Sequence, residues 1–243
     1  MAGEKGRMPP MDVTVVATRS ITPQMKRITF QGEALHLLPA KEPAWWVKVL
    51  LPANEDERPQ SRAYTIRRFD RAAAQVDIDF VLHGDSGPGS AWATQAQPGE
   101  KICLAGPRSG RMSLPDEGWL LLAGDETALP AIATILEGLP NDRDVTAFIE
   151  VDNAAEEQTL AAPRDARIHW RRRASRAASP GALLCDAVGG TVLPPGPGYA
   201  FVAAETLAVQ AIKKRLLDTL PPERISAKGY WKMGAADHKD RDG

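Results

Sequence analysis

The sequence predicts a fold in two parts, an N-terminal six-stranded antiparallel β-barrel followed by an α/β domain built on a parallel sheet. The chain has 243 residues, more than a usual single domain of ~100–150 residues. Short runs rich in Val, Ile and Thr fill the first half, whereas apolar strands alternate with helix-like segments in the second. The rhythm changes near residues 114–118, so we expect domains at residues 1–115 and 116–243.

Six runs in the first half have the composition of β-strands. In the run at residues 75–83, Val76, Ile78 and Phe80 share one face and alternate with aspartates. Short strands of this kind, separated by turn residues, are typical of a closed antiparallel barrel. The six runs are residues 12–22, 25–32, 45–52, 62–68, 75–83 and 100–107.

A glycine-rich loop that opens a short helix interrupts these strands at residues 87–96, GPGSAWATQA. Its glycines let the backbone approach a ligand closely, and Ser90 stands near the helix start, where free N–H groups bind phosphate. The same pattern is typical of a tight turn with an N-cap serine. Taken alone, the loop leaves both interpretations open.

The second half alternates strands and helices, which favours a parallel α/β sheet. Glu205 ends the fourth strand, at the carboxyl edge where such sheets bind ligands, and it is equally a helix-start charge favoured by the helix dipole. The expected strands are residues 119–125, 144–151, 167–173, 198–205 and 224–234, and the expected helices are residues 126–139, 181–188 and 206–220.

Composition excludes several classes of function. The net charge is -1, so no bulk basic field indicates a nucleic-acid or membrane partner. Cys103 and Cys185 lie in apolar runs without a CxxC pair, and HxxxH and HExxH are missing, so we expect no bound metal and two buried thiols in a reducing cytoplasm. The first residues lack the apolar region of a signal peptide, and no apolar run reaches the ~18 residues of a transmembrane helix. We expect a cytoplasmic protein without membrane insertion.

The segment SRAYTIRR, residues 61–68, is the first candidate binding segment. Side chains repeat every two residues along a strand, so Arg62 and Tyr64 point the same way. A ring beside a guanidinium can stack on a flat ligand while the cation pairs with phosphate. An exposed strand with ordinary surface arginines is the alternative, but together with the loop at residues 87–93 the segment favours a dinucleotide with a flat ring.

A barrel followed by an α/β domain, with RxYT on a barrel strand, resembles the ferredoxin reductase superfamily, and most closely its siderophore-interacting proteins, or ferric siderophore reductases. The matching segments occur in family order between Met11 and Gly234: SRAYTIRR, VDIDFVLHGDSGPGSAWA, PGEKICLAGPRSG, LLAGDETALPAIATILEGLP and GYWKMG. The resemblance implies a barrel domain that holds FAD non-covalently and a second domain like those that bind NAD(P)H.

By position, the resemblance also implies a set of FAD-binding residues and no separate catalytic residue. Tyr64 would lie against the isoalloxazine ring, and Arg62 would hold the pyrophosphate. His83 and the backbone of its strand would border the flavin, and the C-terminal Tyr-Trp pair would lie near it. The full set is Arg62, Ala63, Tyr64, Thr65, Phe80, Val81, His83, Ser90, Ala91, Trp92, Ala93, Asp125, Thr127, Tyr230 and Trp231.

The resemblance leaves the electron donor open. Asp125, Glu126 and Thr127 lie where a pyridine nucleotide or the outer half of FAD would meet the second domain. The segment LLAGDETALP lacks the G-x-G-x-x-G fingerprint, whereas ordinary ferredoxin reductases carry a glycine-rich turn there. Members of the family take electrons from NAD(P)H or from ferredoxin, so both are expected donors.

The resemblance further implies a basic pocket beside the flavin for an anionic ferric siderophore. Lys48, Arg108 and Lys232 match the basic triad of the family and are the expected substrate-binding residues. Lysine at position 232 keeps the charge but lacks the guanidinium fork. Each of the three is also consistent with a solvated surface cation. Reduction to Fe(II) weakens chelation by hard oxygen ligands, so the protein needs no metal ligand of its own.

The leading hypothesis is therefore an FAD-dependent ferric siderophore reductase that frees iron in the cytosol. A general reductase of free flavin, quinone or a partner protein is the first alternative, and a non-catalytic carrier of ferric siderophore is the second. The basic run at residues 169–176 is expected to be a solvated loop. Its alternatives are the steering of an acidic partner such as ferredoxin and binding of the 2′-phosphate of NADPH.

Overall fold

The computed structural model of the chain describes residues 8–39, 42–51, 60–83, 87–110, 112, 114–173 and 179–235. These residues form two compact units, which divide between Gly110 and Arg111. The division falls a few residues before the expected change of rhythm at residues 114–118.

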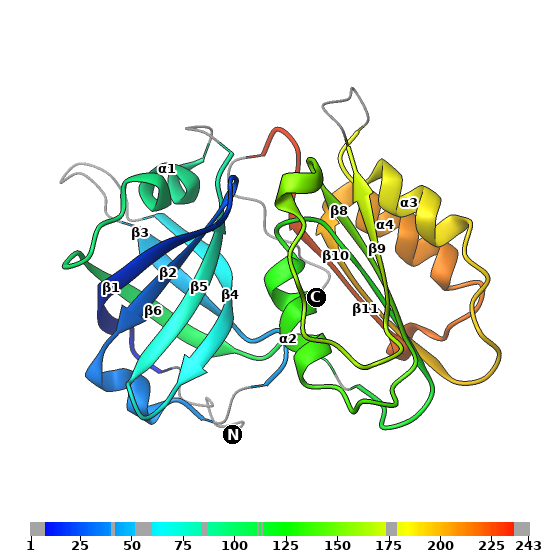
Figure 1. The fold of residues 1–243 in the computed structure, drawn as a ribbon, viewed down its shortest axis with the longest axis horizontal. Helices are drawn as coiled ribbons and strands as arrows, with labels where there is room; N and C mark the ends of the chain where they lie inside the picture. The colour runs from blue at the N-terminus through cyan, green and yellow to red at the C-terminus, as the bar shows by residue number, and fades with distance from the viewer. Residues whose placement is uncertain are drawn as a thin grey trace, which may run out of the picture. The chain divides into compact units, whose positions relative to one another are not determined.

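The first unit is, in its described residues, a closed six-stranded antiparallel barrel with the strand order β1-β2-β5-β4-β3-β6. The predicted fold class of this half is therefore confirmed (Figure 1). A 3-10 helix η1 (Glu33–Leu37) follows β2, and α1 (Pro88–Gln95) lies between β5 and β6 in the chain. The strands are β1 (Met11–Thr22), β2 (Met25–Gln31), β3 (Trp46–Leu51), β4 (Gln60–Asp70), β5 (Gln75–Val81) and β6 (Lys101–Arg108).

Alternation along the strands builds the barrel core. In β3, Val47, Val49 and Leu51 are buried, whereas Trp46 and Lys48 occupy the opposite face. Burial of each such aliphatic side chain stabilises the fold by about 1.5–3 kcal/mol. The largest fully buried side chains of the barrel are Ile28, Phe30, Leu35, Leu38, Ile66, Ile78, Phe80 and Leu104.

The second unit contains, in its described residues, a five-stranded parallel sheet with the order β11-β10-β7-β8-β9. This confirms the α/β half of the predicted fold. The strands are β7 (Trp119–Gly124), β8 (Val145–Val151), β9 (Arg167–Arg172), β10 (Gly198–Glu205) and β11 (Ile225–Trp231). The helices are α2 (Leu129–Glu137), α3 (Ala182–Gly189) and α4 (Thr206–Leu216), with short 3-10 helices η2 (Ala154–Glu156) and η3 (Pro222–Arg224).

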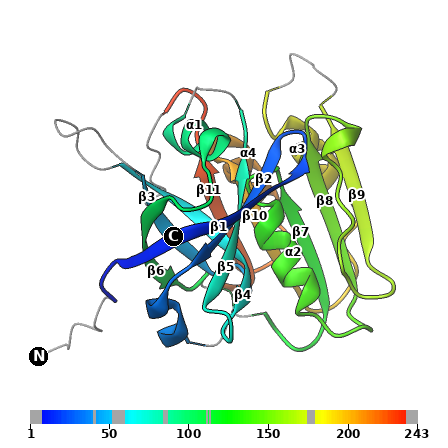
Figure 2. The ribbon, with the colours of Figure 1, turned by 60° about the vertical axis from the view of Figure 1, so that its left-hand side comes forward.

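Helices cover both faces of this sheet. The helices α3 and α4 pack on one face, and Figure 1 shows α2 on the other. Figure 2 shows α2 in front of the sheet, where it packs against β7. Every residue of β7 and β10 is buried, as expected for parallel strands covered on both faces. Since all five strands run the same way, their carboxyl ends share one edge of the sheet.

The two cysteines differ from their predicted burial. Cys103 and Cys185 are free thiols, and both are partly exposed. The Sγ of Cys103 donates to Asp12 Oδ1 at 2.9 Å, and this bond raises the pKa of the thiol. Among the described residues, no cluster of three or more His, Cys, Asp or Glu side chains could hold a metal ion.

Within the described parts of the chain, no helix has both the length and the apolar character needed to cross a membrane.

Candidate functional site

Arg62 and Tyr64 of β4 lie on one face of the strand, as the alternation predicts. They pair with Val49 and Val47 of β3, whose side chains are buried in the barrel. Both side chains reach the start of α1, because a β-carbon added to Gly89 would lie 2.0 Å from Tyr64 Oη and 3.8 Å from Arg62 Cγ. The contact with Arg62 would tolerate a side chain, but only a glycine lets this backbone approach the Tyr64 hydroxyl so closely.

The ring of Tyr64 packs on Phe80, with 4.3 Å between the ring centroids. Phe80 also contacts Trp92 of α1 edge-on, at 5.5 Å. Burial raises the pKa of Tyr64 to about 12, and the nearby charge of Arg62 opposes this rise. The phenol therefore stays protonated across physiological pH and can donate a hydrogen bond.

Ser90 does not cap α1, so the N-cap serine considered from the sequence is wrong. The N-cap is Gly87, and Ser90 lies inside the helix, buried. The backbone N–H of His83 donates to Ser90 Oγ at 3.0 Å, which ties α1 to the end of β5. A β-carbon on Gly87 would lie 2.9 Å from His83 Cε1, so this histidine also lies against the helix start.

The start of α1 fits the phosphates of a dinucleotide. Its N-cap is a glycine, which has no side chain to accept from the first turn. The first turn of Pro88–Gln95, all of it described, holds no acidic residue. A positive helix end with an arginine side chain against it suits a phosphate, and a neighbouring phenol ring suits a flat ring system. In the structure the Arg62 guanidinium itself donates to Ser61 O and to Gln60 Oε1. The residues present therefore fit the FAD that the resemblance implies.

The remaining predicted FAD residues of the barrel lie around this group. Ala63 is exposed on β4 and pairs with Lys48, whereas Thr65 is buried and pairs with Trp46. The side chain of Phe80 is fully buried, so it packs against Tyr64 and is not itself exposed to a ligand. Val81 ends β5, and Ala91, Trp92 and Ala93 continue α1, where Ala93 is buried.

The outer face of β3 and β6 brings two of the three predicted substrate cations together. Trp46 pairs with Arg108, and Lys48 pairs with Ala105, on neighbouring strands. The guanidinium of Arg108 lies 4.9 Å from the centroid of the Trp46 ring. The indole Nε1 donates to Ser109 O at 3.2 Å, so the ring that supports Arg108 is itself held.

Trp46 was not among the site residues expected from the sequence. Its neighbour Trp45 is buried in the barrel, whereas Trp46 is partly exposed. The alternation of the strand indicates this position, because Trp46 lies two residues before Lys48 and therefore shares its face of β3.

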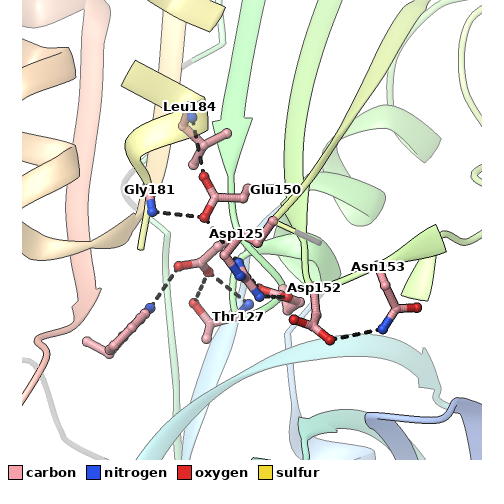
Figure 3. A network of polar contacts seen from close by, with 10 residues as sticks. Asp125, Thr127, Glu150, Asp152, Asn153, Gly181 and Leu184 are labelled. Atoms are coloured by element: carbon pink, nitrogen blue, oxygen red, sulfur yellow. Dashed lines mark hydrogen bonds and ion pairs between the residues drawn. The ribbon is translucent and has the colours of Figure 1, made fainter. Parts of the chain in front are cut away.

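In the α/β unit, Asp125 lies at the carboxyl end of β7 and is buried, with 2% of its surface exposed. Its Oδ1 accepts from Thr127 N at 2.9 Å and from Thr127 Oγ1 at 2.6 Å (Figure 3). Its Oδ2 accepts from Trp231 Nε1 at 2.7 Å. Burial raises the pKa of Asp125, and these hydrogen bonds oppose the rise.

A cluster of one arginine and two glutamates lies at the same edge of the sheet and connects the ends of three strands. Arg173, just past β9, donates through Nη1 to Glu126 Oε2 and to Glu150 Oε1, each at 3.1 Å. Its Nη2 donates to the other oxygen of Glu126. Burial raises the pKa of Glu126, and the contact with Arg173 opposes the rise. One arginine thus serves two carboxylates from β8 and from the turn after β7.

The basic run at residues 169–176 is not a solvated loop in its described part, and that prediction was wrong. Residues 169–172 lie within strand β9, in agreement with the strand expected at residues 167–173, and their cations have partners inside the unit. Arg172 pairs with Glu157 at 2.6 Å, Arg173 pairs with the two buried glutamates, and Arg171 lies over the ring of Phe148. Residues 174–176 lie outside the described residues.

Carboxylates of the chain occupy the starts of α3 and α4. Glu150 accepts from Gly181 N at 2.9 Å and from Leu184 N at 3.3 Å, and Figure 3 shows both bonds. Glu205 caps α4, accepting from Leu207 N at 2.6 Å and from Ala208 N at 3.3 Å. Of the two interpretations of Glu205, the helix-start charge is the one that the geometry supports. These two helix starts differ from that of α1, at which no capping carboxylate is found among the residues that the structure describes.

The three predicted C-terminal residues follow one another at the end of β11. Tyr230 and Trp231 are partly exposed, and Lys232 is exposed. The indole of Trp231 reaches back to Asp125, and so the structure joins two predicted site residues that are 106 positions apart.

Comparison with known proteins finds the same family in both units. Residues 117–234 match the siderophore-interacting protein family, and residues 14–57 and 53–111 match its siderophore-interacting FAD-binding domain. The chain is 31% identical over 265 residues to ferric vibriobactin reductase ViuB of Vibrio cholerae, covering 99% of this chain and 97% of that one.

Solved structures show the same similarity. A siderophore utilization protein from T. fusca has a TM-score of 0.83 and 35% identity, covering 96% of this chain and 97% of that one. The siderophore-interacting protein SipS from Aeromonas hydrophila has a TM-score of 0.82 and 27% identity, covering 93% and 92%. The similarity therefore extends over the barrel and the α/β unit alike.

Proposed function

Because this chain belongs to the family of siderophore-interacting proteins, we propose that it is an FAD-dependent reductase of ferric siderophores. The FAD-binding domain and the reductase relative make it an oxidoreductase. The proposal rests on one observation: the side chains of Arg62 and Tyr64 lie against the first turn of α1, whose N-cap is a glycine.

The barrel residues would bind and orient the cofactor. Arg62 and the first N–H groups of α1 would pair with the pyrophosphate, while Tyr64 would lie against the flavin ring as a neutral hydrogen-bond donor. His83, held beside Gly87, would border the same ring. FAD, when bound, supplies the redox chemistry, accepting electrons from a donor and passing them singly to the ferric centre.

The cations would hold the substrate. Lys48 and Arg108 on the barrel face, and Lys232 in the α/β unit, would pair with an anionic ferric chelate. Trp46 would keep Arg108 in place. Reduction to Fe(II) weakens binding by hard oxygen ligands, and the proposal includes release of the iron in the cytosol.

Two donors remain candidates, NAD(P)H and reduced ferredoxin. The turn after β7 has no glycine-rich fingerprint, and Glu150 and Glu205 already occupy the starts of α3 and α4. A pyridine nucleotide would therefore have to place its phosphates elsewhere, because a carboxylate at a helix start repels a second anion.

Replacing Lys48 with alanine tests the substrate half of the proposal. We expect the KM for an anionic ferric chelate to rise about tenfold, the equivalent of one charge-assisted contact. FAD content should not change, because Lys48 lies on the face opposite to Val47 and Val49 of the core. Steady-state reduction of a ferric tris(catecholate), with Fe(II) trapped by a chromogenic chelator, measures the effect.

Lys101→Ala is the matched control, because Lys101 is an exposed lysine of the same barrel. Lys48→Arg should recover most of the activity if charge is what matters. Equal KM values in Lys48→Ala and Lys101→Ala would remove Lys48 from the substrate site. A wild-type protein that reduces free flavin or quinone but no ferric chelate would instead support the more general reductase.

A further inference from the structure

The segment that carries Trp231 and Lys232 is fixed by three contacts, one with the end of β7 and two with the junction of β10 and α4. It leaves β11, which is an edge strand and pairs in parallel with β10. The pairing shifts register there, because Ala204 faces Gly229 and Glu205 faces Trp231. Tyr230 is thus the extra residue of a β-bulge, a feature that redirects the side chains after it.

The first contact holds the indole. Trp231 Nε1 donates to Asp125 Oδ2 at 2.7 Å, while the other carboxylate oxygen is engaged by Thr127. Asp125 is buried, and both of its oxygens are used inside the unit. A nucleotide that bound this carboxylate would have to share it with Trp231 and Thr127.

The second and third contacts hold the backbone on either side of Lys232. Thr206 Oγ1 donates to Trp231 O at 2.8 Å. A β-carbon on Gly229 would lie 2.5 Å from Thr206 Oγ1, so glycine at this position permits the approach. On the other side, Met233 N donates to Glu205 Oε1 at 3.3 Å, and the turn closes with Ala235 N donating to Lys232 O at 3.1 Å.

We propose that Asp125 and Glu205 are positioning residues, which together clamp the Trp231–Met233 segment and so fix the orientation in which Trp231 and Lys232 act in ligand binding. This inference rests on the proposed function, and it replaces direct contact between Asp125 and a nucleotide with an action through Trp231. The two carboxylates come from the ends of β7 and β10, so the sheet itself sets their spacing.

Each carboxylate has its two oxygens facing different donors, which makes the amide a sharp test. In Asp125→Asn, one position becomes an NH₂ group, which must face either Trp231 Nε1–H or the two donors of Thr127. In Glu205→Gln, the NH₂ group must face either Met233 N–H or the N–H groups of α4. The size of the side chain is conserved, and at least one donor in each variant loses its acceptor.

The first measurement needs no cofactor. The chain has six tryptophans, so a ¹H–¹⁵N spectrum of the full chain should show six indole signals. Trp231→Phe identifies one of them by its loss. In Asp125→Asn we expect that same signal to move upfield and to exchange its proton faster, because its charged acceptor is gone. Asp165→Asn, at an exposed aspartate of the same unit, should leave it in place.

The second measurement tests the presentation of the ligands. The gallium(III) complex of a tris(catecholate) has the charge of the ferric complex and cannot be reduced under these conditions, so its Kd is measured without turnover. In the protein loaded with FAD, we expect Asp125→Asn and Glu205→Gln each to raise this Kd about tenfold, the equivalent of one hydrogen bond to a charged group. Glu223→Gln, at an exposed glutamate, is the control for Glu205→Gln.

The outcomes separate the clamp from the proposed function. A shifted indole signal with weaker gallium-chelate binding, and an unchanged KM for NAD(P)H, supports the clamp. An unchanged Kd in both amide variants overturns it, as does a rise confined to the KM for NAD(P)H in Asp125→Asn, which would indicate direct nucleotide contact. If wild type binds neither chelate, the proposed substrate is wrong. The clamp then stands if Asp125→Asn weakens FAD binding and falls if FAD affinity is unchanged.

Discussion

Replacing Arg173 with methionine is expected to lower the free energy of unfolding by about 3–5 kcal/mol, the cost of leaving a buried charge without its partner. Glu150 is fully buried, and the Glu126 side chain is nearly so, and Arg173 is the cation that contacts both in the described structure. Urea unfolding at neutral pH measures the loss. The control is Arg172→Met, because Arg172 is exposed and solvent weakens its pairing with Glu157, so little stability should be lost.

The loss in free energy of unfolding caused by Arg173→Met should become smaller as the pH falls. Burial raises the pKa of Glu126, and loss of the arginine raises it further, because the opposing contact is gone. A carboxyl whose pKa is higher folded than unfolded binds protons more tightly in the fold, so stability rises as the pH falls from above the raised pKa toward the ordinary value. The difference in free energy of unfolding between wild type and Arg173→Met should therefore be smaller at pH ~4.5 than at pH ~7.5. A deficit that is independent of pH, or as small as that of Arg172→Met, contradicts this account of the charge network.

Replacing Gly89 with alanine is expected to abolish tight FAD binding. The new β-carbon would lie 2.0 Å from Tyr64 Oη, so the helix start or the phenol must move. Overpacking of this kind costs about 1–3 kcal/mol, which corresponds to FAD binding weakened by up to ~100-fold if the strain falls on the site. Titration of apo-protein with FAD, followed by flavin fluorescence, measures the affinity.

A second substitution tells steric strain from general misfolding. In Gly89→Ala/Tyr64→Phe the hydroxyl is absent, and the next ring atom lies 3.3 Å from the new carbon, so much of the affinity should return. Gly189→Ala is the control, because a β-carbon there meets nothing within 4 Å. An unchanged FAD affinity in Gly89→Ala would mean that FAD binding does not depend on the close contact between Tyr64 of β4 and Gly89 of α1.

Much of the fold could be predicted, because the chain changes from a period of two residues to alternating apolar strands and helices. Strand β3 shows why the period is a reliable guide: Val47 and Val49 are buried, and Lys48 between them is not. The family resemblance, read from the order of short motifs, is confirmed by the matches in both units. The electron donor was left open in the sequence and is still a proposal.

The misread features depend on contacts between residues far apart in the chain. Arg173 belongs to a run of cations that looks solvated, but its partners Glu126 and Glu150 come from other strand ends. Local patterns do not show such partners. The contact of Asp125 with Trp231 likewise joins residues far apart in the chain, and the expected role of Asp125 at the cofactor stays a prediction. A buried carboxylate accepts hydrogen bonds from whichever donors the fold brings near it, so its partners become known only from the structure.

The most direct test of the central claim is an anaerobic absorption experiment on the protein loaded with FAD. Reduction with dithionite, followed by removal of the excess, makes the result independent of the natural donor. On addition of a ferric tris(catecholate), we predict that the yellow flavin spectrum returns and that a chromogenic chelator traps Fe(II) in proportion. A protein that cannot be loaded with FAD, or a bleached flavin that the ferric chelate leaves bleached, would contradict the account.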